Sequence, residues 1–152
     1  MTVKTIKLQR IKDIEYHLRN YHTYKVGIKN LTNQLNYIMP NVTASYEVAE
    51  GSTGTFNIAS KTEKYAIDRI ESRKALDLHE DMKKYELIIN AIDESLNGLD
   101  EMEKCFIEYR YFDGMTISKT AMKLGYSDKY IFNIRNQTFN KLLISLRGIL
   151  QI

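Results

Sequence analysis

Apolar residues recur at alternating intervals of three and four along the centre of this chain, at Ala75, Leu78, Met82, Tyr85, Ile89, Ile92, Leu96 and Leu99. Residues at such intervals share one face of an α-helix, so this segment predicts a long amphipathic helix. The first forty residues have the same period. The 152 residues include one Pro and seven Gly, which is typical of long helices and not of turn-rich β-sandwiches or barrels. We therefore expect an all-α fold.

The pattern alone does not determine what covers this apolar stripe, defined as residues 75–99. We expect the stripe to pack on the N-terminal helices of the same chain, or to form the seam of a coiled-coil homodimer with a second copy.

Helix-breaking residues divide the chain. Asn20 is expected to interrupt the N-terminal helical run and Pro40 to end it. After Pro40, a Ser/Thr-rich segment holds Gly51 and Gly54 and lacks Lys and Arg. The predicted parts are N-terminal helices at 1–40, a flexible loop with room for a short hairpin at 41–60, a long central helix at 61–98 and a helix-turn-helix at 99–152.

Charge is distributed unevenly although the net charge is only +3. Residues 1–40 hold seven basic and two acidic side chains, and residues 61–103 hold seven basic and twelve acidic ones. From Thr116 to the C-terminus there are six basic side chains and a single acidic one, Asp128. A basic end of this kind is a candidate contact for a polyanion.

Helix caps recur through the last third of the chain. Asp100 is placed to cap a helix through Phe112 that ends at Asp113-Gly114. Thr116 can cap a second helix, 117–124, which Gly125 ends. Ser127 can cap a third helix, from 128 towards 150. Two helices joined by a short turn containing Gly form the helix-turn-helix arrangement.

The spacing of small and branched residues is more specific than the caps. Ala121 lies where the two helices would approach each other, and Ile131 and Ile134 would face Ile117 and Leu124. Helices that cross at a steep angle require small and branched residues at such offsets.

This segment resembles region 4 of sigma-70-type transcription factors, the part that reads the −35 promoter element. The matching residues are Leu99, Arg110-Tyr111, Asp113-Gly114, Thr116, Ala121, Leu124-Gly125, Ser127, Ile131, Ile134, Lys141 and Leu142. The whole chain is also similar in layout to phage late-gene regulators of the RinA and ArpU type, including a Ser-Lys-Thr-Glu stretch at 60–63. The resemblance implies a prophage-encoded, sequence-specific regulator that activates late genes, binds double-stranded DNA and contacts RNA polymerase.

Two positions depart from the sigma pattern. Sigma factors place Arg in the recognition helix where this chain has Asp128 and Phe132. Arg binds guanine edges with two hydrogen bonds, so a different target from the −35 sequence is expected. No region like the other parts of a sigma factor precedes the segment, which argues against a complete sigma factor.

Helical phase predicts which side chains would contact DNA, because Ile131 and Ile134 define the inner face of the third helix. The predicted base-contacting residues are Asp128, Lys129, Tyr130, Phe132, Asn133, Asn136 and Gln137. Asn133 suits adenine, Lys129 guanine and Phe132 a thymine methyl group. The predicted phosphate-contacting residues are Thr116, Lys119, Lys123, Ser127, Arg135 and Lys141.

Other sites are not expected. The histidines His17, His22 and His79 lack metal-ligand spacing, and Cys105 is expected to be a small buried apolar residue. We expect no metal, no cofactor and no enzymatic activity. The basic N-terminal segment differs from a secretory signal, and no apolar run approaches the ~20 residues of a membrane span. The sequence therefore predicts a protein of the bacterial cytoplasm.

Two other functions fit the same elements. A phage DNA-packaging adaptor, resembling a small terminase subunit, also joins a helix-turn-helix to an oligomerisation part and would form large rings. An interaction protein of sigma-like fold would bind a polymerase or anti-sigma partner and no DNA. Substitution of Lys129 and Asn133 would spare the partner binding of such a protein, whereas it would abolish operator binding by a regulator.

Overall fold

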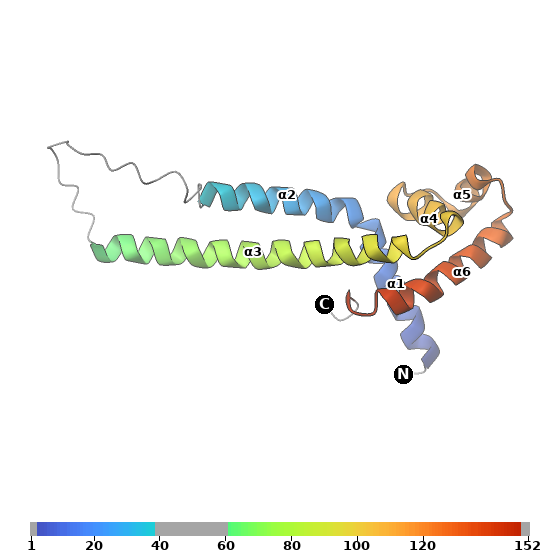
Figure 1. Ribbon diagram of the computed structural model, residues 1–152, viewed down its shortest axis with the longest axis horizontal. Coiled ribbons are helices and arrows are strands. Elements are labelled where there is room, and N and C mark those ends of the chain that lie inside the picture. Colours follow the sequence, from blue (N-terminus) through green and yellow to red (C-terminus); the bar gives the residue numbers. More distant parts are fainter. Residues whose placement is uncertain (1–2, 39–60, 150–152) are drawn as a thin grey trace. The chain divides into compact units, whose positions relative to one another are not determined.

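The computed structural model describes residues 3–38 and 61–149, with side chains at 4–38 and 68–149. The elements are α1 (Val3–Arg19), α2 (Tyr21–Ile38), α3 (Lys61–Asn97), α4 (Glu101–Ile107), the π-helical turn η2 (Glu108–Phe112), α5 (Ile117–Leu124) and α6 (Asp128–Ser145) (Figure 1). The described residues contain no strand, which confirms the all-α fold class. The predicted loop at 41–60 and the end of the first helical run at Pro40 lie outside the described residues.

The chain forms two compact units. The first contains the residues up to Val26 and those from Tyr85 onward, and the second is Gly27–Lys84. These units cut across the predicted ranges 1–40 and 61–98, because α1 packs with the C-terminal helices instead of forming a separate N-terminal part.

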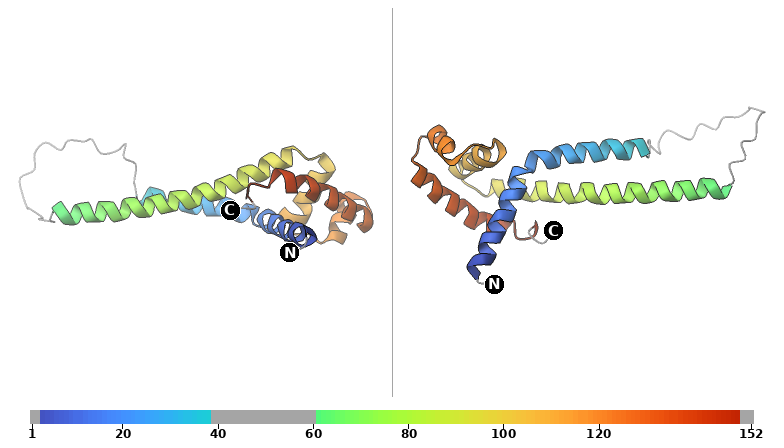
Figure 2. Two further views of the ribbon diagram at one scale, coloured as in Figure 1. Left: turned by 90° about the horizontal axis from the view of Figure 1, so that it is seen from below. Right: turned by 180° about the vertical axis from the view of Figure 1, so that it is seen from behind.

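The core of the first unit lies where α1 contacts α6 and η2. Ile14 and Leu18, one turn apart on α1, are fully buried, as are Phe106 of α4 and Ile131 of α6. Figure 2 shows α1 passing beside α6 in both views. The N-terminal helix is therefore part of the domain that contains the helix-turn-helix.

The second unit is an antiparallel pair of helical segments from α2 and α3, which lie side by side in Figure 1. The Thr32 hydroxyl of α2 lies 3.4 Å from the sulfur of Met82 in α3. Ala75 is buried, and Leu78 and Met82 are half-buried. This part of the apolar stripe thus packs within the chain, and a homodimer through the stripe stays a prediction.

The helix ends agree with the caps read from the sequence, with two differences. The helix capped by Asp100 changes from α to π geometry at Glu108, where the Asp113 N–H donates to the Glu108 carbonyl five residues back at 2.8 Å. The prediction that the last helix runs towards residue 150 was wrong, because α6 ends at Ser145. Gly148 favours the end of a helix, and the turn after Ser145 buries Ile149.

Candidate nucleic-acid interface

The turn between α5 and α6 has the geometry that the sequence predicted. The Thr116 hydroxyl accepts the Lys119 N–H at 3.3 Å, and the Ser127 hydroxyl accepts the Tyr130 N–H at 3.3 Å. Gly125 ends α5 with φ +77°, a left-handed conformation that side chains with a Cβ rarely adopt. These contacts fix the direction in which α6 leaves the turn.

The inner faces of α5 and α6 pack closely. Ala121 is 1% exposed, and Ile131 and Ile134 are buried. The helical phase read from the sequence is therefore the phase of α6 in the structure. It leaves the opposite side of the helix open to solvent.

That opposite side holds the residues predicted to contact bases. All of them are exposed, namely Asp128, Lys129, Tyr130, Phe132, Asn133, Asn136 and Gln137. We call this set the outer face of α6. It combines a cation, amides and aromatic rings, which are the groups that recognise base edges and thymine methyl groups in a major groove.

Asp128 also has an internal role. Its carboxylate accepts a hydrogen bond from the Ser118 hydroxyl of α5 at 2.9 Å, so it joins the two helices of the motif. It also lies in the first turn of α6, where the helix dipole favours a negative charge. Asp128 thus has a hydrogen-bond partner inside the motif.

The residues predicted to contact phosphate are two hydroxyl side chains, two exposed lysines, and two cations that are paired with carboxylates. Thr116 and Ser127 already use their hydroxyls as helix caps. Lys119 and Lys123 are exposed, and the Lys123 ammonium lies 4.0 Å from the centre of the Tyr109 ring. These two lysines remain available for phosphate groups next to the outer face of α6.

Arg135 differs, because it is half-buried and paired inside the first unit. It donates a hydrogen bond to the Glu15 carboxylate of α1 at 2.9 Å, and Tyr111 donates to the same oxygen at 2.8 Å. Burial on its own would raise the pKa of Glu15, but the hydrogen bonds from Arg135 and Tyr111 and the nearby positive charges outweigh it and lower the pKa. Arg135 therefore attaches α1 to α6 through Glu15, and its contact with phosphate stays a prediction.

Lys141 is paired in a similar way. Its ammonium donates to the buried Glu103 carboxylate at 2.7 Å, and this hydrogen bond raises the pKa of Lys141. The same Glu103 oxygen accepts the Asp100 N–H at 3.1 Å and so completes the capping box of α4. Lys141 thus joins α6 to the start of α4.

Aromatic and apolar side chains lie beside the outer face of α6, and sequence reasoning missed part of them. The rings of Tyr126 and Tyr130 are stacked with centroids 4.5 Å apart. Met122 on α5 is 82% exposed and Phe132 is 50% exposed. Tyr126 follows Gly125 directly, and this position in the turn is the sequence feature that would have predicted its exposure beside α6.

Within the part of the chain that the structure describes, no three His, Cys, Asp or Glu side chains come together as metal ligands. The described helices also include none with the length and apolar character needed to span a bilayer.

Comparisons with protein families, curated proteins and solved structures find no match to this chain. The resemblance to sigma region 4 and to phage late-gene regulators therefore rests on the residues themselves.

Proposed function

We propose that this protein is a sequence-specific regulator of transcription that inserts α6 into the major groove of double-stranded DNA. The main support for the proposal is the exposed outer face of α6. This helix follows the turn at Gly125 and is capped by Ser127. By its resemblance, the regulator would be an activator of phage or prophage late genes, would contact RNA polymerase and would act in the cytoplasm of a bacterial host.

The outer face divides the recognition of DNA among its residues. Asn133 has an amide that can make paired hydrogen bonds with adenine, and Lys129 can donate to the guanine acceptors. Phe132, half exposed, can contact a thymine methyl group. Lys119 and Lys123 would hold the phosphates on either side, which provides affinity and register without reading sequence.

A genomic binding selection tests the proposal. The purified full chain is incubated with sheared host and prophage DNA at near-physiological salt, and the retained fragments are sequenced. We expect a few sharply enriched sites near promoters. Uniform retention that disappears with added salt would indicate phosphate contacts only and would refute sequence-specific regulation.

A double variant and its matched control identify the surface responsible. Lys129→Ala with Asn133→Ala is expected to abolish the enrichment. Lys29→Ala with Asn30→Ala removes the same two side-chain types from an exposed part of α2 and should leave the enrichment unchanged. Sedimentation of the full chain gives the oligomeric state, and a large ring would point to a packaging adaptor instead.

A protein-interaction module is the second candidate, because apolar side chains lie exposed beside the same helix. Met122 is 82% exposed and Tyr126 is 44% exposed, and exposed apolar side chains are frequent at protein interfaces. Under this reading, purified RNA polymerase would bind the wild type and the Lys129→Ala/Asn133→Ala variant equally, and the wild type would retain no specific DNA.

A further inference from the structure

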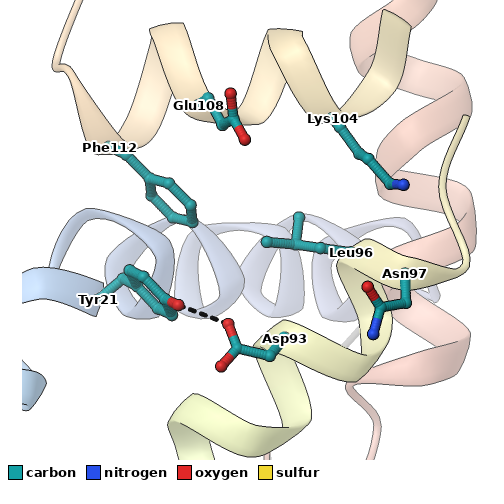
Figure 3. Close-up of a pocket in the computed structure, with 7 residues that line it drawn as sticks. All are labelled: Tyr21, Asp93, Leu96, Asn97, Lys104, Glu108 and Phe112. Atoms are coloured by element: carbon teal, nitrogen blue, oxygen red, sulfur yellow. Dashed lines mark hydrogen bonds between the residues drawn. The ribbon is translucent and has the colours of Figure 1, made fainter. Parts of the chain in front are cut away.

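The first unit contains a cavity of about 360 Å³ that lies apart from the outer face of α6. Its lining comes from the start of α2, the end of α3, and the α4 and η2 segments. Figure 3 shows the carboxylates of Asp93 and Glu108 on opposite sides of the space, with the Phe112 ring and the Leu96 side chain between them. A volume of this size accommodates a small molecule.

One wall of the cavity is aromatic. The Phe112 and Tyr21 rings are stacked, with centroids 4.5 Å apart and planes at 12°. Leu96 adds an aliphatic surface. An apolar stem or a planar cation could pack against this wall.

The two carboxylates have unused acceptor capacity. Asp93 accepts one hydrogen bond, from the Tyr21 hydroxyl at 2.5 Å, through one of its two oxygens. The exposed Glu108 carboxylate has no hydrogen-bond or ion-pair partner among the described side chains. Two cations lie near the cavity: the Lys104 ammonium is 3.4 Å from the exposed Glu101 carboxylate, and the Lys25 ammonium is 4.3 Å from the centre of the Tyr21 ring. Glu108 is thus the lining carboxylate that can accept a further cationic group.

We propose that this cavity binds a small organic cation that carries a guanidinium group. A guanidinium is planar, stacks on aromatic rings and donates two parallel hydrogen bonds to one carboxylate. Phe112 supplies the ring, and Glu108 supplies a carboxylate next to it. The second cationic or polar end of such a molecule would lie toward Asp93.

The π-helical turn supports a binding role for this cavity. Both Glu108 and Phe112 belong to η2, and π-helical turns are rare and are found frequently at functional sites. The same turn holds Tyr111, whose hydroxyl donates a hydrogen bond to Glu15 of α1. The turn thus forms a wall of the cavity and, through Tyr111, part of the attachment of α1.

Titration of the full chain with agmatine tests the proposal directly. Agmatine has a guanidinium and an ammonium on a short aliphatic stem, and glutarate serves as a dianion with a short aliphatic stem. Calorimetry and NMR of labelled protein should show one saturable site for agmatine, with a dissociation constant of about 1 mM or tighter. The amide signals of Glu108 and Phe112 should shift with it, and glutarate should not bind.

Single substitutions locate the site. Glu108→Gln is expected to weaken agmatine binding about tenfold, equivalent to about 1.4 kcal/mol. Phe112→Leu should weaken it also, whereas Glu94→Gln, an exposed carboxylate of α3 outside the lining, should leave it unchanged. Circular dichroism verifies that each variant is folded.

Absence of saturable binding to the folded wild type would overturn the proposal. Equal affinity of the wild type, Glu108→Gln and Glu94→Gln would overturn it too, because binding would then not involve the cavity. The inference does not depend on DNA binding, so its failure would leave the proposed regulatory function standing.

Discussion

Removal of the Glu15 carboxylate should loosen the attachment of α1 to the helix-turn-helix. In the native chain this carboxylate accepts hydrogen bonds from Arg135 at 2.9 Å and from Tyr111 at 2.8 Å. The side chains of Glu15 and Arg135 are 17% and 27% exposed, so water screens their interaction only in part. Glu15→Ala leaves the hydroxyl of the buried Tyr111 without its acceptor and the Arg135 guanidinium without its counter-charge.

We expect this substitution to lower the free energy of unfolding by about 2–3 kcal/mol. A hydrogen bond to a charged group contributes about 1.5–3 kcal/mol, and the estimate for two bonds is reduced because Arg135 can turn towards solvent. Urea unfolding followed by circular dichroism measures the change. Asp81→Ala is the control, because its ion pair with Lys84 is more than half exposed and should contribute no more than about 0.5 kcal/mol.

The effect of Glu15→Ala should also depend on pH. The pKa of Glu15 is lowered in the folded chain from its ordinary value of 4.5, so its contribution to stability is complete above that value. As the pH falls through the lowered pKa, the carboxylate becomes protonated and the contribution is lost. The difference between wild type and variant should therefore shrink in acid. A loss no larger than that of Asp81→Ala, or a difference that is unchanged in acid, would refute the role assigned to this ion pair.

Three further predictions concern the helix-turn-helix. Gly125→Ala should destabilise the chain by about 1–2 kcal/mol in urea unfolding, because the residue has φ +77°, whereas Gly148→Ala, at a position with open space and no positive φ, should not. Ala121→Leu should cost about 1–3 kcal/mol and weaken DNA binding, because a larger side chain at this buried position separates α5 from α6; unchanged unfolding would contradict this. Lys119→Ala and Lys123→Ala should each reduce the slope of log affinity against log salt by about one without changing sequence preference, and an unchanged slope would remove that lysine from the phosphate contacts.

Local signals account for the features that the sequence predicted well. Thr116, Gly125 and Ser127 act on neighbouring backbone groups within a few residues, so their effect can be read from the chain directly. Likewise, the burial of Ile131 and Ile134 follows from helical period.

Long-range pairing accounts for most of what the sequence did not predict. Glu15 and Arg135 are separated by 120 positions, and nothing in the local pattern indicates that they meet. Arg135 and Lys141 were assigned to phosphate by their charge alone, whereas the fold brings an internal carboxylate to each of them. The local pattern does not show that Arg135 contacts α1 or that Lys141, which is 50% exposed, reaches Glu103.

The sequence pattern does not predict the π-helical turn, for a different reason. Residues 108–112 continue the helical spacing of α4, and what distinguishes π from α geometry is backbone hydrogen bonding to the residue five positions back, as from the Asp113 N–H to the Glu108 carbonyl. The cavity beside this turn joins α2, α3 and α4 and therefore depends on tertiary packing.

Selection from randomised double-stranded DNA with the wild type and Asn133→Ala is the most direct test of the claim that α6 reads base edges. We expect one defined motif for the wild type. We expect Asn133→Ala to recover the same motif with the preference for adenine relaxed at one position, at a cost of about 1–3 kcal/mol in affinity. No enriched motif for the wild type, or an identical motif and affinity for the variant, would contradict recognition of DNA by the outer face of α6.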